Sequence, residues 1–354
     1  MKQKQKICCN IVTFAADFQD YKQAMGVSGK KRIEFIDLAK GVCILLIILG
    51  HCGVAVDYPG LTAMRTPLYL TLAGLFFKDY GGIKRLFIRK CNRLLIPFLF
   101  FYIASYVVFY TVNLLQPGLI VSDAKGILDI FTQNQYFNGP LWFLLDIFWS
   151  NILFYCIHAN VKREPMRALA VTLCGIAGYT LYKKGIFLPC FIDCSLLGLP
   201  FFYFGYILKK SNILYPTKYD RYNIPFALLL FTIAFFIDTY AHPTMFFHDK
   251  IVKGNILSMI LLPLTSVTAL MLLCKAIKRI PFISYFGRYS IIPLCIHHLV
   301  YRPIALVVYR MVAPDEGGSY IVAITTIIIC FAAIPLFTHY LPQFTAQKEF
   351  IKEK

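Results

Sequence analysis

Three ionisable residues lie in or beside the first long apolar stretch of the sequence: Lys40, His51 and Arg65. In a helix, the eleven residues from Lys40 to His51 give about 1100° of turn and roughly 16 Å of rise, so both lie on one stripe. An ionisable side chain in apolar surroundings is costly unless it is paired or faces water. We therefore predict a functional interior face.

Arg65 is separated from His51 by one short turn, so the two side chains can face each other across a helical hairpin. Arg65 could then bind a substrate oxyanion or stabilise the charge that develops during acyl transfer. The structural alternatives are that Lys40 and Arg65 reach to lipid headgroups and that His51 only caps its helix. Asp37, one turn before Lys40, is expected to pair with Lys40.

A basic cluster follows at Arg89, Lys90 and Arg93. These residues fall on adjacent positions of a helical turn, which concentrates donors that suit phosphate groups. We predict that the cluster binds an anionic ligand such as a nucleotide diphosphate. Anionic lipid is the simpler alternative.

The composition indicates the elements that must position these residues. Of 354 residues, 58% are hydrophobic and only 15% are charged, which is typical of a polytopic membrane protein. The net charge of +18 does not indicate a nucleic-acid partner, because the basic residues lie at the ends of apolar runs. The sequence predicts an all-α bundle of about ten transmembrane helices, placed at residues 36–56, 61–78, 93–115, 139–158, 166–182, 187–208, 222–239, 255–274, 284–312 and 319–341.

The links between these helices predict the topology. Lys and Arg are concentrated in alternate links, so both termini are expected in the cytoplasm. Residues 1–31 would form a cytoplasmic N-terminal tail, 32–342 the membrane domain and 343–354 a cytoplasmic C-terminal tail. Met25 is an alternative start.

No metal site is predicted. Most of the twelve cysteines lie in apolar stretches, and no pair has the spacing of zinc ligands. His297 and His298 are adjacent in the ninth helix and point in different directions, so we expect at most one of them to share a site with His51. They also lack the i, i+4 spacing of a zinc pair. Pro303 predicts a kink or break in the same helix.

A series of short motifs follows in order along the chain: Arg32–Ile33, Asp37–Gly41, Gly50–His51, Arg65–Leu68, Ala73–Gly74, Arg89–Arg93, Leu95–Pro97, Gly139–Leu144, Phe201–Gly205, Gly287–Arg288 and Ser290–His297. Together they resemble the acyltransferase-3 family of integral-membrane O-acyltransferases, and the resemblance covers about residues 32–340. Two positions depart from the common pattern: Lys40 stands where many members have Arg, and Ala73 where many have Ser.

The resemblance implies transfer of an acyl group, usually acetyl from acetyl-CoA, to a sugar hydroxyl of a cell-surface or secreted polysaccharide. By the same resemblance His51 is the essential histidine, and it would act as a general base because histidine titrates near neutral pH. Lys40 and Arg65 match basic residues of the family, and either would stabilise the tetrahedral oxyanion. The cluster of Arg89, Lys90 and Arg93 would face the donor. The protein is then expected in the bacterial cytoplasmic (inner) membrane. Direct transfer and a covalent intermediate are both open.

Two other functions fit the same residues. One is a transporter or flippase of a glycan or lipid-linked intermediate, in which the intramembrane His and Lys would serve as binding or relay groups. Many transporters contain an internal repeat, and no clear repeat is present in this sequence. An inactive scaffold would not depend on His51.

For an acyltransferase, the outer loops 116–138 and 240–254 are candidate acceptor contacts or ordinary interfacial loops. Their polar and aromatic side chains include Asn134, Gln135, Tyr136, His242 and His248.

Overall fold

The computed structural model describes residues 33–55, 58–117, 125–132, 137–211, 213–247 and 249–352. The predicted N-terminal tail, together with Asn134, Gln135, Tyr136 and His248, lies outside these ranges. The chain divides into two compact units, Met1–Glu34 and Phe35–Lys354, and almost all described residues belong to the second.

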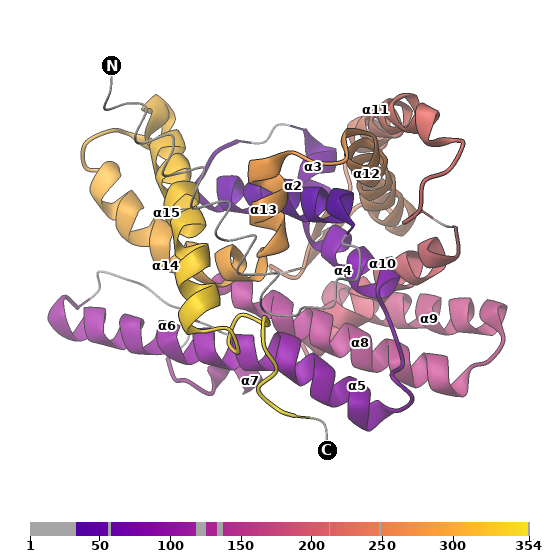
Figure 1. The fold of residues 1–354 in the computed structure, drawn as a ribbon, viewed down its shortest axis with the longest axis horizontal. Coiled ribbons are helices and arrows are strands. Elements are labelled where there is room, and N and C mark those ends of the chain that lie inside the picture. Colours follow the sequence, from indigo (N-terminus) through magenta and orange to yellow (C-terminus); the bar gives the residue numbers. More distant parts are fainter. Residues whose placement is uncertain are drawn as a thin grey trace, which may run out of the picture. The chain divides into compact units, whose positions relative to one another are not determined.

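Helices dominate the second unit (Figure 1). The first half contains α2 (Glu34–His51), α3 (Pro59–Ala63), α4 (Arg65–Leu75), α5 (Ile83–Lys90), α6 (Ile96–Leu115), α7 (Asp129–Thr132), α8 (Trp142–Asn160) and α9 (Glu164–Lys183). The second half contains α10 (Ile192–Leu208), α11 (Asn223–Ala241), α12 (Ile256–Ile277), α13 (Pro281–Arg288), α14 (Ile291–Val308) and α15 (Ser319–Tyr340). An antiparallel hairpin of β1 (Thr244–Phe246) and β2 (Ile251–Lys253) joins α11 to α12.

The predicted all-α polytopic bundle is confirmed. Each of the ten predicted segments contains a helix, and seven helices among the described residues are long and apolar enough to cross a membrane. Of the other three, α4 has eleven residues. Both α2 and α9 carry charged residues near their starts.

The predicted ninth helix, 284–312, is wrong as a single element. It consists of α13 and α14, and the chain breaks at Tyr289–Ser290, whereas Pro303 lies inside α14. The reason is the crossing of α13 over α2. A Cβ atom added at Gly287 would lie 1.9 Å from the Asp37 carbonyl oxygen, so the two backbones are in direct contact. The break lets α13 keep this crossing while α14 takes another direction.

The predicted third helix begins earlier than expected. It continues from α5 through a π-helical turn, Cys91–Leu95, into α6, so residues 83–115 form one continuous span. The basic cluster therefore lies on this long helix and not in a separate link. A π turn inserts one extra residue per turn, and such insertions are frequent at functional sites.

Glycines also fix the position of α4, which packs side by side with α10 (Figure 1). A Cβ at Gly74 would lie 1.8 Å from the Phe202 carbonyl oxygen, and one at Gly205 would lie 1.8 Å from that of Thr71. Only glycine permits this backbone approach, as in many transmembrane helix pairs. The α4–α10 crossing therefore sets where Arg65, the first residue of α4, is placed.

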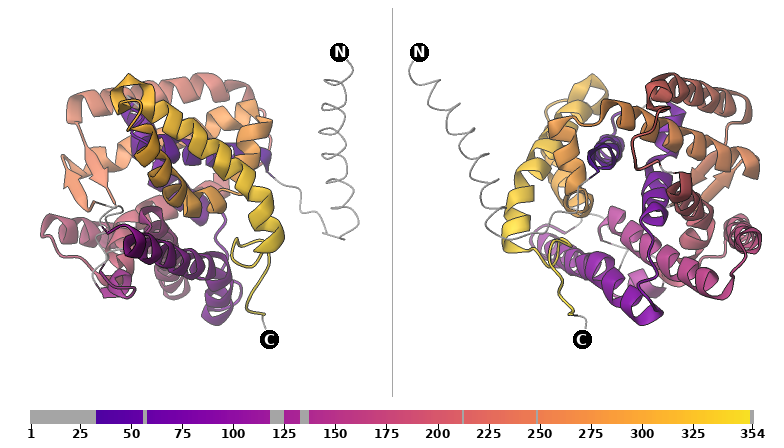
Figure 2. Two further views of the ribbon diagram at one scale, coloured as in Figure 1. Left: turned by 90° about the vertical axis from the view of Figure 1, so that its left-hand side faces the viewer. Right: turned by 45° about the vertical axis from the view of Figure 1, so that its right-hand side comes forward.

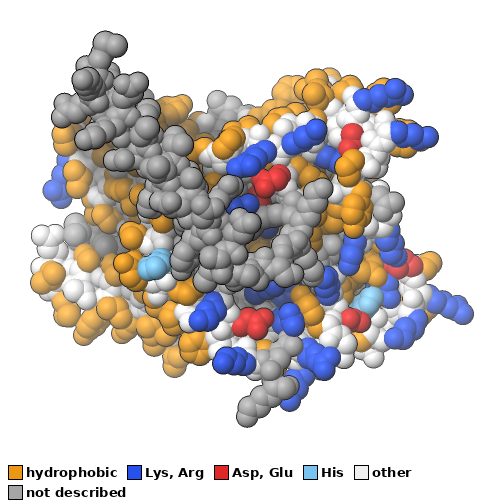
Figure 3. Space-filling view, in the orientation of Figure 1, with side chains coloured by type: hydrophobic (Ala, Val, Ile, Leu, Met, Phe, Trp, Pro, Cys, Tyr) orange, Lys and Arg blue, Asp and Glu red, His pale blue; other side chains and the backbone are white. Residues whose placement is uncertain are grey.

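Two further helix pairs complete the bundle. α11 packs along α12, and α14 packs along α15, as the two views of Figure 2 show. The outer side of α11 leaves Phe226, Leu228 and Phe235 about half exposed. Figure 3 shows apolar side chains along α6 and cationic side chains gathered around α5. This distribution fits helices that face lipid and helix ends that face water.

Candidate active site

A cavity of about 490 Å³ opens at the C-terminal end of α2. α2, α4, the start of α8, the β-hairpin and α14 supply its walls. The charged and titratable residues that line it are His51, Arg65, Asp249, His298 and Arg302, and the aromatic ones are Trp142, Phe143, Phe246 and Phe247. A smaller cavity of about 260 Å³ shares Thr62, Ala63, Met245 and Phe246 with it, which extends the hollow along the hairpin.

Arg65 lies beside His51, because its guanidinium packs on the last turn of α2. A Cβ at Gly50 would lie 2.4 Å from Arg65 Nη1, so the absence of a side chain at Gly50 makes room for the arginine. The Cys43 thiol donates to the Arg65 carbonyl oxygen at 3.2 Å, which ties the start of α4 to α2. The structure thus brings Arg65 and His51 to one cavity across a helical hairpin.

Two further histidines surround His51. His51 Nδ1 lies 3.3 Å from His298 Nε2, and the ring centroids of His51 lie 4.7 Å from His298 and 5.3 Å from His297. The expectation that at most one of the adjacent pair shares a site with His51 is therefore wrong. α14 passes so close to the end of α2 that two side chains pointing in different directions both reach the same ring.

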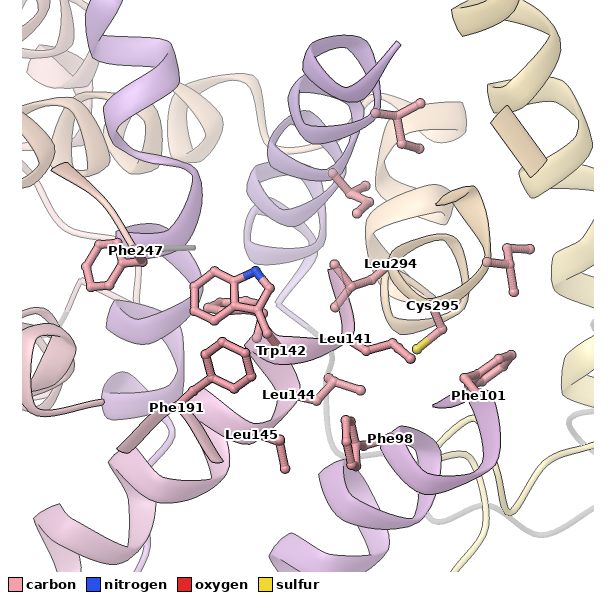
Figure 4. Close-up of a cluster of buried hydrophobic side chains, with 14 of the residues drawn as sticks. Phe98, Phe101, Leu141, Trp142, Leu144, Leu145, Phe191, Phe247, Leu294 and Cys295 are labelled. Atoms are coloured by element: carbon pink, nitrogen blue, oxygen red, sulfur yellow. The ribbon is translucent and has the colours of Figure 1, made fainter. Parts of the chain in front are cut away.

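Gly139 helps to hold His298 in this position. A Cβ at Gly139 would lie 2.8 Å from the Cε1 atom of His298, so the short turn Gly139–Leu141 packs directly on the imidazole. Below it lies an apolar core, where Trp142 and Leu294 meet side chains such as Phe98 and Phe247 (Figure 4). Trp142, Leu294 and Phe247 also line the cavity, so the cavity floor is the top of this core.

The β-hairpin is fastened over the cavity by polar contacts. Lys250 Nζ lies 3.2 Å from the buried carboxylate of Asp193 on α10, and the Tyr182 hydroxyl donates to the Phe247 carbonyl oxygen at 3.1 Å. Because burying a lone carboxylate is costly, this ion pair is a strong constraint on the hairpin position. The hairpin can therefore present Phe246, Phe247 and Asp249 as a fixed wall.

Lys40 is not brought to this cavity. It lies on the same helix as His51 but eleven residues earlier, which is roughly 16 Å along the axis, and it is not among the described residues that line the cavity. Its carbonyl oxygen accepts a hydrogen bond from the Tyr69 hydroxyl at 3.1 Å. Asp37, the acidic residue expected to pair with Lys40, has its Oδ2 atom 3.8 Å from Arg288 Nε on α13.

The basic cluster lies elsewhere on the molecule. Arg89 and Lys90 end α5, and Arg93 follows in the π turn. The Arg89 guanidinium lies 4.8 Å from the centre of the Tyr80 ring, Lys90 is partly buried and Arg93 is exposed. All three belong to one stretch of helix, and none is among the described residues that line the cavity at His51.

The sequence analysis did not identify Trp142, Asp249 and Arg302 as parts of the site, and it allowed for only one of the two adjacent histidines. The available signal was the same one that identified His51, namely an ionisable residue in an apolar run. This signal predicted that His51, His297 and His298 lie inside the bundle, but it did not indicate which helices they would face.

Comparisons with known proteins identify the family of the chain. A model of the acyltransferase domain of the family Acyl_transf_3 matches residues 33–340. Neither the curated proteins nor the solved structures gave a match. The family match covers most of the chain, including all the helices described above, and the protein therefore belongs to the acyltransferase-3 family of membrane acyltransferases.

Proposed function

We propose that this membrane acyltransferase transfers an acetyl group from cytoplasmic acetyl-CoA to a sugar hydroxyl of a cell-surface or secreted polysaccharide. The observation that supports it most directly is the placement of His51 and Arg65 in one open cavity. A base and a cation side by side are what acyl transfer to a hydroxyl requires. The membrane would be the bacterial cytoplasmic membrane, with both termini inside.

His51 is the general base in this proposal, and His298 is its positioning residue. If His51 Nδ1–H donates to His298 Nε2, across the 3.3 Å that separates them, the lone pair of His51 lies on Nε2. A hydroxyl oxygen that attacks the thioester carbonyl carbon then gives its proton to Nε2. When the carbon–sulfur bond breaks, the departing CoA thiolate takes that proton back, so the histidine is regenerated.

Arg65 supplies the charge that this reaction needs. Its guanidinium, packed against Gly50 beside His51, would stabilise the negative oxygen of the tetrahedral intermediate. Trp142 and Phe143 offer flat apolar surfaces on which a sugar ring can stack, and Asp249 and Arg302 offer polar contacts to its hydroxyls. The acceptor is therefore proposed to occupy the side of the cavity formed by α8, the hairpin and α14.

The donor would approach from the other side. Arg89, Lys90 and Arg93 are proposed to bind the phosphates of acetyl-CoA, since clustered guanidinium and ammonium groups suit that charge. The pantetheine arm would then run along α2 past Lys40 towards His51. Lys40 lies too far from His51 to contact the same acyl group, so its role is with the donor.

The test uses the full-length protein in nanodiscs with acetyl-CoA labelled in the acetyl group and surface polysaccharide extracted from the host. Three proteins are compared: the wild type, His51→Gln, and His339→Gln, which alters an exposed histidine on α15. We expect labelled polysaccharide from the wild type and His339→Gln, and a rate about 10²- to 10⁴-fold lower from His51→Gln.

A transporter would give a different result. It would bind or move the glycan while leaving acetyl-CoA intact, in the wild type and in all variants. Binding of labelled acetyl-CoA, measured without any glycan, separates this outcome from an acceptor that is simply wrong. Specific binding that is lost when Arg89, Lys90 and Arg93 are replaced supports the acyltransferase, and no binding at all contradicts it.

A further inference from the structure

Three imidazole rings from two helices meet at the end of α2. His51 is the last residue of α2, and His297 and His298 are consecutive residues of α14. Each offers one ring nitrogen, and these three nitrogens lie within 4.8 Å of one another. The acyl-transfer mechanism uses His51 and His298 but gives His297 no task.

One separation among these nitrogens matches that in a metal-ion site, and all three nitrogens lie within 4.8 Å of one another. A tetrahedral zinc ion with imidazole nitrogens at about 2.0–2.1 Å holds two ligand nitrogens roughly 3.3–3.4 Å apart. His51 Nδ1 and His298 Nε2 are 3.3 Å apart. The same two atoms can therefore share a hydrogen bond, or they can form one edge of a coordination tetrahedron with little movement of either helix.

His297 is prepared to act as the third ligand. Its ring is fully buried, and Nδ1 donates to the Pro293 carbonyl oxygen at 2.7 Å. That bond fixes the tautomer and leaves the lone pair on Nε2, which has no hydrogen-bond partner among the described residues. A backbone acceptor on one ring nitrogen and an open lone pair on the other is the usual arrangement of a metal-binding histidine.

The chemistry of the three ligands selects the kind of ion. Neutral imidazoles bind zinc and related transition metals, whereas magnesium and calcium require oxygen ligands. His51 and His298 line the cavity, so the fourth coordination position would open towards it. Arg65 and Arg302 line the same cavity and oppose a dication, whereas Asp249 favours one. These charges point to reversible binding and not to a permanent structural ion.

We propose that His51, His297 and His298 form a binding site for one zinc-type metal ion, and that occupation of this site switches off acyl transfer. The second part rests on the proposed function. A metal ion on His51 Nδ1 leaves the ring proton on Nε2, so His51 has no lone pair with which to accept a proton from the acceptor hydroxyl. The metal-bound and the catalytic forms of His51 are therefore mutually exclusive.

The binding arm of the test contains no acetyl donor or acceptor. Full-length protein in nanodiscs is stripped with a chelator and titrated with Zn²⁺ against a chromophoric competitor. We expect one ion per chain in the wild type and in His339→Ala. His297→Ala and His51→Ala should each weaken binding by more than about 100-fold, since losing a ligand costs more than losing an outer-shell partner. His51 is exposed, so its replacement leaves the fold intact even if the buried His297 does not tolerate change.

X-ray absorption at the zinc edge then identifies the ligands. Three nitrogen neighbours at about 2.0–2.1 Å support the site. Sulfur neighbours, or equal affinity in the wild type and both variants, would overturn it.

The inhibition arm adds Zn²⁺ to the wild type during acetyl transfer. A loss of rate that follows the binding curve and is reversed by chelator supports the switch, and an unchanged or increased rate at full occupancy refutes it. A protein that binds zinc at the three histidines but neither binds acetyl-CoA nor transfers acetyl would refute the proposed function and leave the metal site standing.

Discussion

The cavity at His51 and the basic cluster at Arg89 differ in how the chain builds them. The cavity takes its residues from α2, α4, α8, the β-hairpin and α14, and two of them, His51 and Arg302, are 251 positions apart. The cluster takes its residues from five consecutive positions, Arg89 to Arg93. The first exists only when the bundle is packed, whereas the second exists as soon as one helix forms.

Because of this difference, we expect the two regions to respond differently to substitutions. In the cavity, Arg65 touches Gly50 and His298 touches Gly139, so a single methyl group at either glycine would collide with a functional side chain. In the cluster, Arg93 is exposed and its side chain can adjust to its ligand. Small changes in packing should therefore damage the chemical step at the cavity, and changes of charge should affect only donor affinity at the cluster.

Among the changes that test this contrast, the largest effect is expected for Gly50→Ala. The added Cβ would lie 2.4 Å from Arg65 Nη1, so the guanidinium has to move away from the developing oxyanion. Loss of one such interaction typically lowers kcat by about 10²- to 10³-fold. The rate of acetyl transfer is measured at saturating acetyl-CoA, together with the thermal midpoint, which a helical alanine should not lower.

A double-mutant cycle is the control for Gly50→Ala. If the alanine acts through Arg65, then Arg65→Ala combined with Gly50→Ala is no slower than Arg65→Ala alone. Additive losses would contradict this account, because they would mean that the glycine serves the helix and not the arginine.

Replacement of residues in the basic cluster should have a smaller effect on activity, and the effect should be on KM and not on kcat. Arg89→Ala, Lys90→Ala and Arg93→Ala should each raise the KM for acetyl-CoA by about tenfold, which is the usual value of a charge-assisted hydrogen bond, and leave kcat unchanged. The increase should shrink at high salt, where such contacts are screened. Lys162→Ala, in a different polar link, is the matched control.

A fall in kcat at unchanged KM would reverse the assignment of the two regions. The cluster would then take part in the chemical step, and the phosphates of the donor would have to bind elsewhere.

The same contrast explains what the sequence could predict. Hydrophobic length located a helix in each of ten segments, and local charge density located Arg89, Lys90 and Arg93, because both signals are contained in short stretches of chain. His51 and Arg65 were expected to face each other because only residues 52–64 separate α2 from α4. None of these steps required knowledge of which distant helices touch.

The remaining features depend on contacts that no local pattern encodes. His297 and His298 meet His51 only because α14 crosses the end of α2. The break between α13 and α14 follows from the backbone contact of Gly287 with Asp37, whereas the sequence pointed to Pro303. A glycine in the sequence indicates that another backbone can pack closely against that position. It does not indicate which helix packs there, so only the structure identifies the neighbouring helix.

The smallest effect on activity is expected at Asn92, in the π turn between Lys90 and Arg93. Its side chain makes three hydrogen bonds to the backbone of the C-terminal tail: Nδ2 donates to the Ile351 carbonyl oxygen at 2.8 Å, and Oδ1 accepts from the amides of Phe350 and Ile351 at 2.9 and 2.8 Å. At about 1 kcal/mol each, their loss in Asn92→Ala should speed hydrogen exchange at these two amides by roughly 10²-fold.

Asn92→Asp should show an intermediate exchange rate, because a carboxylate keeps both acceptor bonds, although it loses the Nδ2 donor and sets an oxygen against the Ile351 carbonyl oxygen. In both variants the KM for acetyl-CoA should stay within about twofold of the wild type, since the cluster is formed by its own helix and not by the tail. An increase comparable to that of Arg93→Ala would break the contrast between the two regions. The donor site would then also depend on a contact between residues 92 and 351, and the C-terminal tail would have to be counted as one of its walls.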